Sequence, residues 1–528
     1  MAEGLRPDPR VVVIGAGVGG LVSALLLACR GLQVTLVETA AGPGGKMRAL
    51  EVDGASIDAG PTVFTMRWVF DEILAEVGSS LDALVRTAPL SVLARHAWRD
   101  HAPRLDLFAD AARSADAIAA FASPAEGRRY LAFCKQAARI YQRLEGPHIR
   151  SSRPSLVQMA SDLGPGGIGA LAGLGPFANL WQTLGRHFHD ARLRQLFARY
   201  ATYCGASPWL APATLMLIAH VEQEGVWSIE GGMAELAEAL SRLAAARGVV
   251  LRYGSAVDRI LVQQGRVSGV VLAGGEHLAA DAVVFNGDAN ALAQGLLGDA
   301  VAAPLAPPLR AAERSLSAVT WALHVQSEGF PLTRHNVFFE PDYASEFDDI
   351  FRQRRLPRQG TVYVCAQDRL DDGPAPAGRE RLLALVNAPA HGDSQSFDEA
   401  EVDRCEQRSL ALLQACGLRL HITHRQQVLR RTPVDFQRLF PGSGGALYGP
   451  ATHGWMSLFK RAGATTAVPG LYLAGGSVHP GPGVPMAAMS GRLAAATLMA
   501  HLDSTSRSRR VVISGGMSTP SATMASTA

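Results

Sequence analysis

The chain has 528 residues and a formal net charge of +3, and 48% of its residues are hydrophobic while only 18% are charged. A net charge this small gives no reason to expect nucleic acid as a partner. The length allows several regions around a large core, and the mean hydropathy of +0.10 suits an apolar tunnel or a membrane-facing surface.

The first predicted unit, from Val11 to Glu38, is a strand, a glycine turn, a helix and a second strand. Val11–Ile14 is typical of a buried parallel strand, and a helix is expected from Val18 to Cys29. Between them GAGVGG matches G-x-G-x-x-G, whose glycines permit a sharp turn, close approach of a pyrophosphate and close helix packing. Glu38 stands where a carboxylate accepts hydrogen bonds from a ribose. The unit therefore predicts binding of the ADP half of a dinucleotide at a helix N-terminus.

A second match to the same pattern, GPGGIG at residues 164–169, follows no strand and contains Pro165. We interpret it as a loop. The chain then has one dinucleotide site, and no separate site for a nicotinamide cofactor is visible.

The next elements are a glycine turn and a mostly helical region. Gly44 and Gly45 precede Lys46, and this turn offers a second surface for pyrophosphate; a short strand pair and a turn at Gly60–Pro61 follow. From Met66 to Arg199 the pattern is mostly helical. Residues 163–185 and 201–219 contain no charged residue but are broken by glycine and proline, so neither predicts a membrane-spanning helix.

The C-terminal half alternates strands and helices. A helix at Glu230–Gly248 precedes a β-hairpin and a buried strand in DAVVFNGD. Residues 300–460 mix strands (SAVTWALHV, TVYVCAQ, RLLALVNA) with a helix at Asp398–Cys416, and Pro469–Ala500 predicts strand, glycine loop and helix again. From about Ser504 the chain is rich in Ser and Thr and is expected to be disordered.

The six cysteines are scattered, with no Cys-x-x-Cys pair and no cysteine–histidine spacing typical of a metal site. We therefore expect no bound metal and a reduced, cytosolic chain.

Four segments resemble the phytoene desaturase-like flavoproteins, the bacterial carotenoid desaturases that are related in fold to the amine oxidases. They are GAGVGGL, GGKMRALEVDGASIDAGPT, the block from the Gly231–Gly232 helix to FNGD, and LYLAGGSVHPGPGVPMAAMSGR, and the likeness spans about residues 10–500. The section from Arg199 to Met233 resembles the hydroxyneurosporene (1-hydroxycarotenoid 3,4-) desaturase branch more than phytoene desaturase itself. Lys46 stands where many members carry Arg, which keeps the charge but loses the planar fork.

The resemblance implies an α/β fold of the amine oxidase/phytoene desaturase type. A Rossmann-like FAD-binding domain would comprise residues 10–65, 229–300 and 465–502. An inserted mixed α+β substrate domain would comprise residues 66–228, the helical and membrane-facing part, and 301–464. Residues 503–528 would form the disordered tail.

The resemblance also implies FAD as the cofactor and assigns residues to its parts. The pyrophosphate would lie on Gly15, Ala16, Gly17, Gly19 and Gly20, and the adenosine ribose on Glu38, with Gly45 and Lys46 nearby. The isoalloxazine would lie near Gly60, Pro61 and Thr62, and would be approached by Val484, Pro485 and Met486 at the start of the last helix. Gly475 and Gly476 would pass the pyrophosphate and ribityl chain. Val257 would face the adenine, or is an ordinary strand residue.

The implied reaction is desaturation of an acyclic carotenoid, with 3,4-desaturation of 1-hydroxyneurosporene-type carotenoids expected. Hydride passes from the allylic carbon to flavin N5, and the neighbouring carbon loses a proton that delocalisation has made acidic. No catalytic residue is assigned, because no nucleophile–base pair stands out. His479, Glu222, Glu224 and Glu230 remain open, as proton acceptors, as contacts of a substrate hydroxyl or as ordinary satisfied side chains. Reoxidation needs an external acceptor, quinone or oxygen.

Three other expectations follow. The lipophilic substrate and the uncharged stretches predict peripheral attachment to the cytoplasmic face of a bacterial membrane. The alternatives are a phytoene desaturase or an amine oxidase-like enzyme, although the last cysteine, Cys416, is far from the Gly475–Met486 loop, which lacks Tyr and Trp for an aromatic cage. Non-catalytic escort proteins share the fold but do not need an intact phosphate turn.

Overall fold

A five-stranded parallel sheet carries the N-terminal motif. The computed structural model describes residues 8–99, 101–152, 178–310, 313–370, 376–394 and 397–513. The sheet order is β10-β2-β1-β14-β21, and every pairing is parallel. The strands, drawn from three separate stretches of the chain, are β1 (Arg10–Ile14), β2 (Gln33–Val37), β10 (Val250–Arg252), β14 (Ala282–Phe285) and β21 (Leu471–Leu473).

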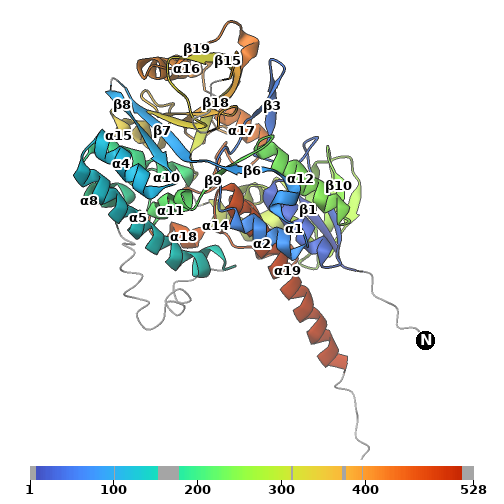
Figure 1. The fold of residues 1–528 in the computed structure, drawn as a ribbon. Helices are drawn as coiled ribbons and strands as arrows, with labels where there is room; N and C mark the ends of the chain where they lie inside the picture. Colours follow the sequence, from blue (N-terminus) through green and yellow to red (C-terminus); the bar gives the residue numbers. More distant parts are fainter. Residues whose placement is uncertain are drawn as a thin grey trace, which may run out of the picture.

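Both faces of this sheet are covered, which explains the unbroken apolar run of β1. Val11 and Val13 pack with the helices α1 (Val18–Cys29), α12 (Met233–Ala246) and α19 (Val484–Ile513). Val12 on the opposite face packs against a three-stranded antiparallel sheet made of β11 (Val257–Gln263), β12 (Arg266–Leu272) and β13 (His277–Ala279). The predicted Rossmann-like α/β architecture is confirmed (Figure 1).

α1 and α19 cross at very short range. A Cβ on Gly491 would lie 2.2 Å from the carbonyl oxygen of Gly19. The hydroxyl of Ser23 donates to the carbonyls of Gly19 (2.7 Å) and Gly491 (3.2 Å). This crossing joins the start of the chain to its last helix.

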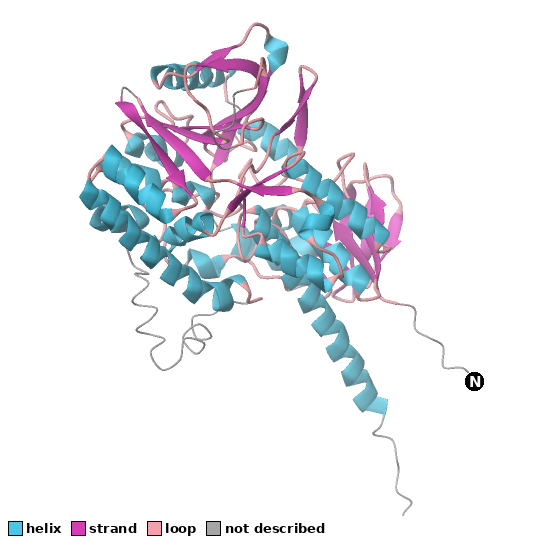
Figure 2. Cartoon of the chain, viewed as in Figure 1, coloured by secondary structure: helices cyan, strands magenta, loops and turns pink. Residues whose placement is uncertain are grey.

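An eight-stranded mixed sheet forms the second half of the molecule, in the order β19-β15-β18-β17-β16-β7-β8, with β20 paired to β15. One face packs on α16 (Glu399–Ala415), and the other faces the helical part of the chain. Figure 2 shows strands and helices segregated in this half. The strands are β7 (Val92–Trp98), β8 (His101–Phe108), β15 (Ser317–Glu328), β16 (His335–Phe339), β17 (Val362–Ala366), β18 (Glu380–Ala388), β19 (Arg419–His421) and β20 (Val428–Arg431).

The region from Met66 to Arg199 is less helical than predicted, because β7 and β8 add two strands to this sheet. β7 pairs in parallel with β16, more than 200 residues away, and antiparallel with β8. The helices of this part and its continuation are α2 (Trp68–Glu76), α3 (Leu81–Leu84), α4 (Ala111–Phe121), α5 (Pro124–Leu144), α8 (Leu180–His187), α9 (Ala191–Ala198), α10 (Tyr200–Tyr203) and α11 (Leu217–Gln223). Residues 153–177, which include the GPGGIG segment and part of the first uncharged stretch, lie outside the described residues.

The remaining elements connect the two halves. They are the predicted hairpin of β3 (Ala49–Val52) and β4 (Ala55–Asp58), a small sheet of β5 (Phe64–Thr65), β9 (Val226–Ile229) and β6 (Thr87–Pro89), and the helices α13 (Ala289–Ala293), α14 (Asp299–Arg310), α15 (Tyr343–Phe347), α17 (Pro433–Leu439) and α18 (Ser457–Lys460). Short π-helices lie at Glu145–Ile149 and Asp348–Arg352, and 3₁₀ turns at Ala213–Met216 and Arg425–Gln427.

The C-terminal helix is longer than the sequence analysis expected. α19 continues to Ile513, through residues 503–513 that were assigned to a disordered tail, and it projects from the molecule in Figure 1. Arginine is a good helix former, and three arginines lie in this extension. Within the part of the chain that the structure describes, no helix has the length and apolar character needed to cross a membrane.

Candidate active site

The glycine turn, residues 15–20, joins β1 to α1 at the carboxyl end of the parallel sheet. Gly15 has φ +98°, a left-handed conformation that favours glycine, and a Cβ on Gly20 would lie 2.0 Å from the carbonyl oxygen of Gly15. Gly17 is the N-cap of α1 and provides no side-chain cap, so N–H donors of the first turn remain for a ligand. These features fit the pyrophosphate of a dinucleotide.

Asn286, directly after β14, fills the turn from the opposite side and was missed by the sequence analysis. Its Nδ2 donates to the Gly15 carbonyl at 3.3 Å. A Cβ on Gly17 would lie 2.8 Å from that Nδ2, and a Cβ on Gly19 would lie 2.7 Å from the Asn286 Oδ1. The available signal was its position at the carboxyl end of a buried parallel strand, where ligands bind in open α/β sheets.

The C-terminal glycine loop lies against the same turn. A Cβ on Gly19 would come within 2.9 Å of the Gly475 nitrogen and 2.8 Å of the Ala487 carbonyl oxygen, and the Gly475 N–H donates to Ser490 Oγ at 2.7 Å. Gly476 keeps open space beside it, since the nearest atom to a Cβ there would be 3.8 Å away. Val484 begins α19, with Pro485 and the half-buried Met486 in its first turn. The structure therefore brings the two predicted glycine motifs together.

Glu38 is tied to the turn and to the strands near Val257. Its carboxylate accepts hydrogen bonds from the N–H groups of Ala16 (2.7 Å) and Ala40 (2.8 Å). Its carbonyl accepts from the Ser255 N–H at 2.8 Å, and Val257 begins β11 two residues later. The predicted ribose and adenine residues thus lie on neighbouring segments.

The second glycine turn packs on the first. Gly44 bridges Gly17, and a Cβ on Gly45 would lie 3.2 Å from the Gly17 Cα. Gly60 lies on the far side of this turn, because a Cβ there would be 1.8 Å from the Lys46 carbonyl oxygen. The Pro61–Thr62 segment follows, and Thr62 Oγ1 lies 2.7 Å from the hydroxyl of Tyr363.

Two cations lie in the middle of the molecule beside these loops. Lys46 Nζ donates to the Leu447 carbonyl at 2.6 Å, and burial lowers its pKa to about 8. Burial also lowers the pKa of Arg461 to about 10, and its guanidinium donates to the carbonyls of Pro450 (2.7 Å), Tyr448 (3.1 Å) and Gly476 (3.3 Å). Among the described residues neither cation forms an ion pair. Sequence reasoning did not single out Arg461.

We infer an enclosed space beside these loops from the surroundings of six half-buried side chains. Six side chains keep part of their surface accessible, yet burial is the leading influence on the pKa of each, so they face an enclosed volume rather than open solvent. They are Lys46, Arg199, Tyr203, Cys204, Tyr448 and Arg461. We call the volume that they border the central space.

The four residues that the sequence analysis left open as acid–base candidates differ in how exposed they are to solvent. Glu224 and Glu230 are exposed and face His220 (3.3 Å) and Arg86 (3.7 Å). Glu222 is buried, burial raises its pKa, and it accepts from the Tyr200 hydroxyl at 2.8 Å.

The imidazole of His479 is also buried, in the C-terminal glycine loop, and burial lowers its pKa. Its Nε2 bonds the Ser151 carbonyl at 2.8 Å, which leaves Nδ1 as the unprotonated nitrogen. Within the described chain this Nδ1 has no hydrogen-bond partner. Burial therefore favours the neutral form of the His479 imidazole.

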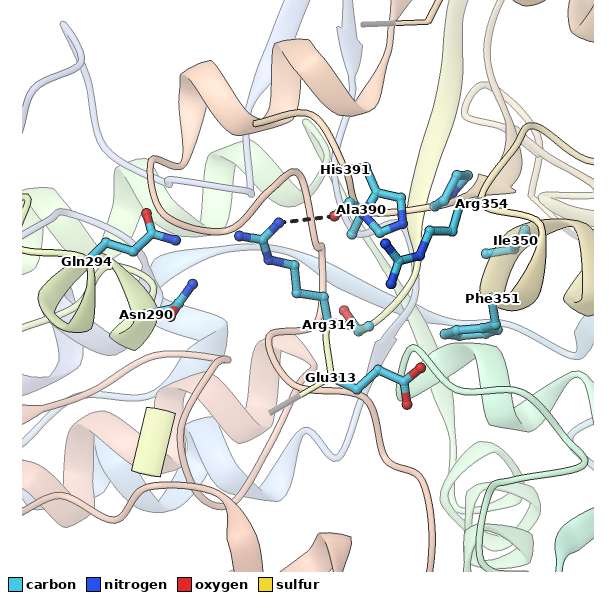
Figure 3. Close-up of a pocket in the computed structure, with 11 residues that line it drawn as sticks. Asn290, Gln294, Glu313, Arg314, Ile350, Phe351, Arg354, Ala390 and His391 are labelled. Atoms are coloured by element: carbon cyan, nitrogen blue, oxygen red, sulfur yellow. Dashed lines mark hydrogen bonds between the residues drawn. The ribbon is translucent and has the colours of Figure 1, made fainter. Parts of the chain in front are cut away.

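A separate cavity of about 520 Å³ lies where α13 faces residues 350–354 and 389–391. Figure 3 shows Arg314 reaching across it to the Ala390 carbonyl, with Arg354 and His391 beyond. Charged and amide groups dominate its lining, so the cavity does not suit a polyene. The lining residues are Asn290, Gln294, Glu313, Arg314, Ser315, Ile350, Phe351, Arg354, Pro389, Ala390 and His391.

Comparison with known proteins agrees with this geometry. Residues 175–499 match the family described as flavin containing amine oxidoreductase, and residues 13–76 match an NAD(P)-binding Rossmann-like domain. The chain is 66% identical to hydroxyneurosporene desaturase of Rubrivivax gelatinosus over 99% of both chains. It is 45% identical to hydroxyneurosporene desaturase of Cereibacter sphaeroides, over 94% of this chain and 99% of that one.

A solved structure of a putrescine oxidase variant has the same fold, with a TM-score of 0.61 and 15% identity over 94% of this chain and 99% of that one. The family is flavin-dependent, and the uncapped N-terminus of α1, the two glycine turns and Glu38 fit FAD. The chain belongs to the flavin-containing amine oxidoreductases, in the group that includes the hydroxyneurosporene desaturases.

Proposed function

We propose that the protein catalyses the FAD-dependent 3,4-desaturation of acyclic 1-hydroxycarotenoids such as 1-hydroxyneurosporene. The observation that carries this proposal is the 66% identity with a hydroxyneurosporene desaturase over 99% of both chains. The complete phosphate turn supports catalysis over a non-catalytic escort role, because Gly15, Gly17 and Gly20 are all present and closely packed.

The chain's own residues position the reactants and exclude water. Bound FAD supplies the two-electron acceptor for the hydride that leaves the allylic carbon. The N-terminus of α19 begins at Val484 beside the glycine loop, so its positive dipole end favours negative charge there. Lys46 and Arg461 add positive charge to the same region.

The remaining partners follow from this chemistry. The electrons must leave through an external acceptor, quinone or oxygen. The substrate dissolves in lipid, so we infer that the protein attaches peripherally to the cytoplasmic face of a bacterial membrane. Gly45 and Lys46 are proposed near the ribose or the phosphates, Gly60, Pro61, Thr62 and Met486 near the isoalloxazine, and Val257 near the adenine.

The test is a comparison of products. Purified protein should carry non-covalent flavin, and 1-hydroxyneurosporene, neurosporene and phytoene are offered separately in liposomes. We expect the absorbance of the hydroxylated carotenoid to shift to longer wavelength as its conjugation grows. Conversion of phytoene without conversion of the hydroxylated substrate would replace the proposal by a phytoene desaturase. Oxidation of amines instead would indicate an amine oxidase-like enzyme.

A further inference from the structure

Arg199 is a guanidinium held deep in the molecule at the junction of α9 and α10. It caps α9, which ends at Ala198, and α10 begins at Tyr200. Its Nη1 donates to the Tyr203 hydroxyl at 3.0 Å, and its charge lies 5.2 Å from the ring centroids of Tyr203 and Tyr363. The aromatic faces stabilise the cation where water is scarce.

Within the described chain, most N–H donors of the Arg199 side chain have no partner. A guanidinium has five N–H donors in a fixed fork. Among the described residues Tyr203 is the hydrogen-bond partner of this side chain, and no carboxylate lies within ion-pair distance of it. Burial opposes the charge of Arg199, but the surrounding tyrosines, first Tyr203 and then Tyr363 and Tyr343, raise its pKa overall. The side chain is thus a permanently charged donor that faces the central space.

Arg199 is linked to the proposed isoalloxazine site through Tyr363. The Tyr363 hydroxyl lies 2.7 Å from Thr62 Oγ1 and 2.7 Å from His335 Nδ1, and Arg199 covers the ring of the same tyrosine. Tyr448 is also near Arg199, since the charge of Arg199 is among the influences on the pKa of Tyr448, and the Tyr448 carbonyl accepts from Arg461 at 3.1 Å. Arg199 therefore borders the central space on the side of Thr62.

The chemistry of the proposed substrate requires a polar group at this place. In a 1-hydroxycarotenoid the hydroxyl oxygen on C1 is only about 3 to 5 Å from C3 and C4, since three and four bonds of about 1.5 Å separate it from these carbons. The hydroxyl must therefore enter the reaction zone with the carbons that are desaturated. An apolar wall there would leave the hydroxyl without a hydrogen-bond partner. The free-energy cost of burying an unpaired hydroxyl would then make the site prefer carotenoids without one.

We propose that Arg199, oriented by Tyr203, binds the C1 hydroxyl and makes the site prefer 1-hydroxylated carotenoids over the plain ends. The substrate oxygen accepts a hydrogen bond from an unused N–H of Arg199. Tyr203 fixes the guanidinium through the 3.0 Å hydrogen bond, and Glu222, which accepts from Tyr200, lies close enough to influence the pKa of Tyr203. This assignment rests on the proposed function, whose substrate class it explains.

The experiment compares the full-length protein with Arg199→Met, Arg199→Lys and Tyr203→Phe, all loaded with FAD. Binding of 1-hydroxyneurosporene and of neurosporene is measured without oxygen, by quenching of tryptophan fluorescence in liposomes, and turnover of each is measured separately. Arg199→Met fills similar volume without donors, Arg199→Lys restores a charged donor, and Tyr203→Phe removes one hydroxyl. Tyr472→Phe is the matched control, because the Tyr472 hydroxyl bonds His501 at 2.9 Å on the nucleotide half.

We expect the preference for the hydroxylated carotenoid to fall about tenfold in Arg199→Met and Tyr203→Phe, the loss typical of one hydrogen bond to a charged group. Arg199→Lys should recover part of this preference, and Tyr472→Phe should keep the full preference of the wild type. If Arg199→Met fails to fold, as judged by its flavin content, Tyr203→Phe decides. An unchanged preference in Tyr203→Phe and in any folded Arg199 variant overturns the assignment while the proposed function stands. A wild type that converts neither substrate overturns both.

Discussion

Glu38 accepts a hydrogen bond from the N–H of Ala16 at 2.7 Å, so the acid that directly follows β2 is joined to the glycine turn that follows β1. The second carboxylate oxygen accepts from Ala40 at 2.8 Å. One side chain thus holds the turn in shape and presents negative charge at the edge where the ribose is proposed to lie.

Replacing Glu38 by Gln should weaken FAD binding about tenfold or more. An amide can accept only one of the two N–H bonds and would point its own N–H₂ group at the other donor. The dissociation constant of FAD from the apoprotein measures the effect. Glu51→Gln, the same change on the exposed β3, is the control, and equal affinities in the two variants would contradict the prediction.

Gly17→Val should abolish flavin binding. The added side chain would occupy the N-cap of α1 and meet Asn286 Nδ2, since even a Cβ lies 2.8 Å from it. Gly274→Val is the matched control, because nothing lies within 4 Å of a Cβ there. The measurement is the flavin absorbance of the two purified variants. If Gly17→Val retained flavin, this turn would not be part of the flavin-binding site.

The affinity for FAD should fall as the pH rises above about 8. Burial lowers the pKa of Lys46 to about 8, so the apoprotein loses this cation in that range, and an anionic ligand must then recover a proton on binding. The unfolded chain keeps its lysine protonated to higher pH, so the apoprotein is stabilised relative to it as the pH rises from 8 towards 10.5. Dissociation constants between pH 7 and 9.5 test this, with Lys46→Met expected to flatten the profile and the exposed Lys135→Met to leave it unchanged.

Arg369→Met should lower the free energy of unfolding by about 3 to 5 kcal/mol, because it leaves a buried carboxylate without its partner. Arg369 and Glu380 are 8% and 2% exposed and form two hydrogen bonds of 2.8 Å. The control is Arg425→Met, at a side chain that is 92% exposed. This change should alter the free energy of unfolding by less than about 0.5 kcal/mol. Denaturant unfolding compares the two, and similar losses would refute the assignment.

The protein should float with liposomes in a density gradient. The proposed substrate enters from lipid, and a surface that dips into the interface spares the polyene a passage through water. We expect flotation to persist at high salt, because the attachment is apolar rather than ionic. Recovery of the protein in the dense fraction at both low and high salt would argue against membrane attachment.

The N-terminal unit was predictable because its signals are local. The helix begins at Val18 and ends at Cys29 in the structure as in the prediction, between a glycine N-cap and Gly31. The strand pair before Gly60 and the helix from Glu399 were predictable for the same reason.

What the sequence could not reveal depends on contacts between distant segments. β7 is a strand because it pairs with β16, and no pattern within residues 92–98 predicts that pairing. Asn286, Arg461 and Arg199 become candidates for the site only after three stretches of chain converge. Conversely, Glu224 and Glu230 were plausible by type but lie on the exposed surface.

The crossing of α1 and α19 has a consequence for biosynthesis. Ser23 bonds Gly491, and β21 pairs with β14 only when residue 473 has been made. At about 5 to 20 residues per second, the ribosome needs roughly half a minute to two minutes to deliver the whole chain. Until α19 has been made, the face of α1 that it covers stays exposed, although α12 can already pack on α1. Because Gly475 and Ala487 lie against the first glycine turn, we expect stable flavin insertion only after these residues have been made.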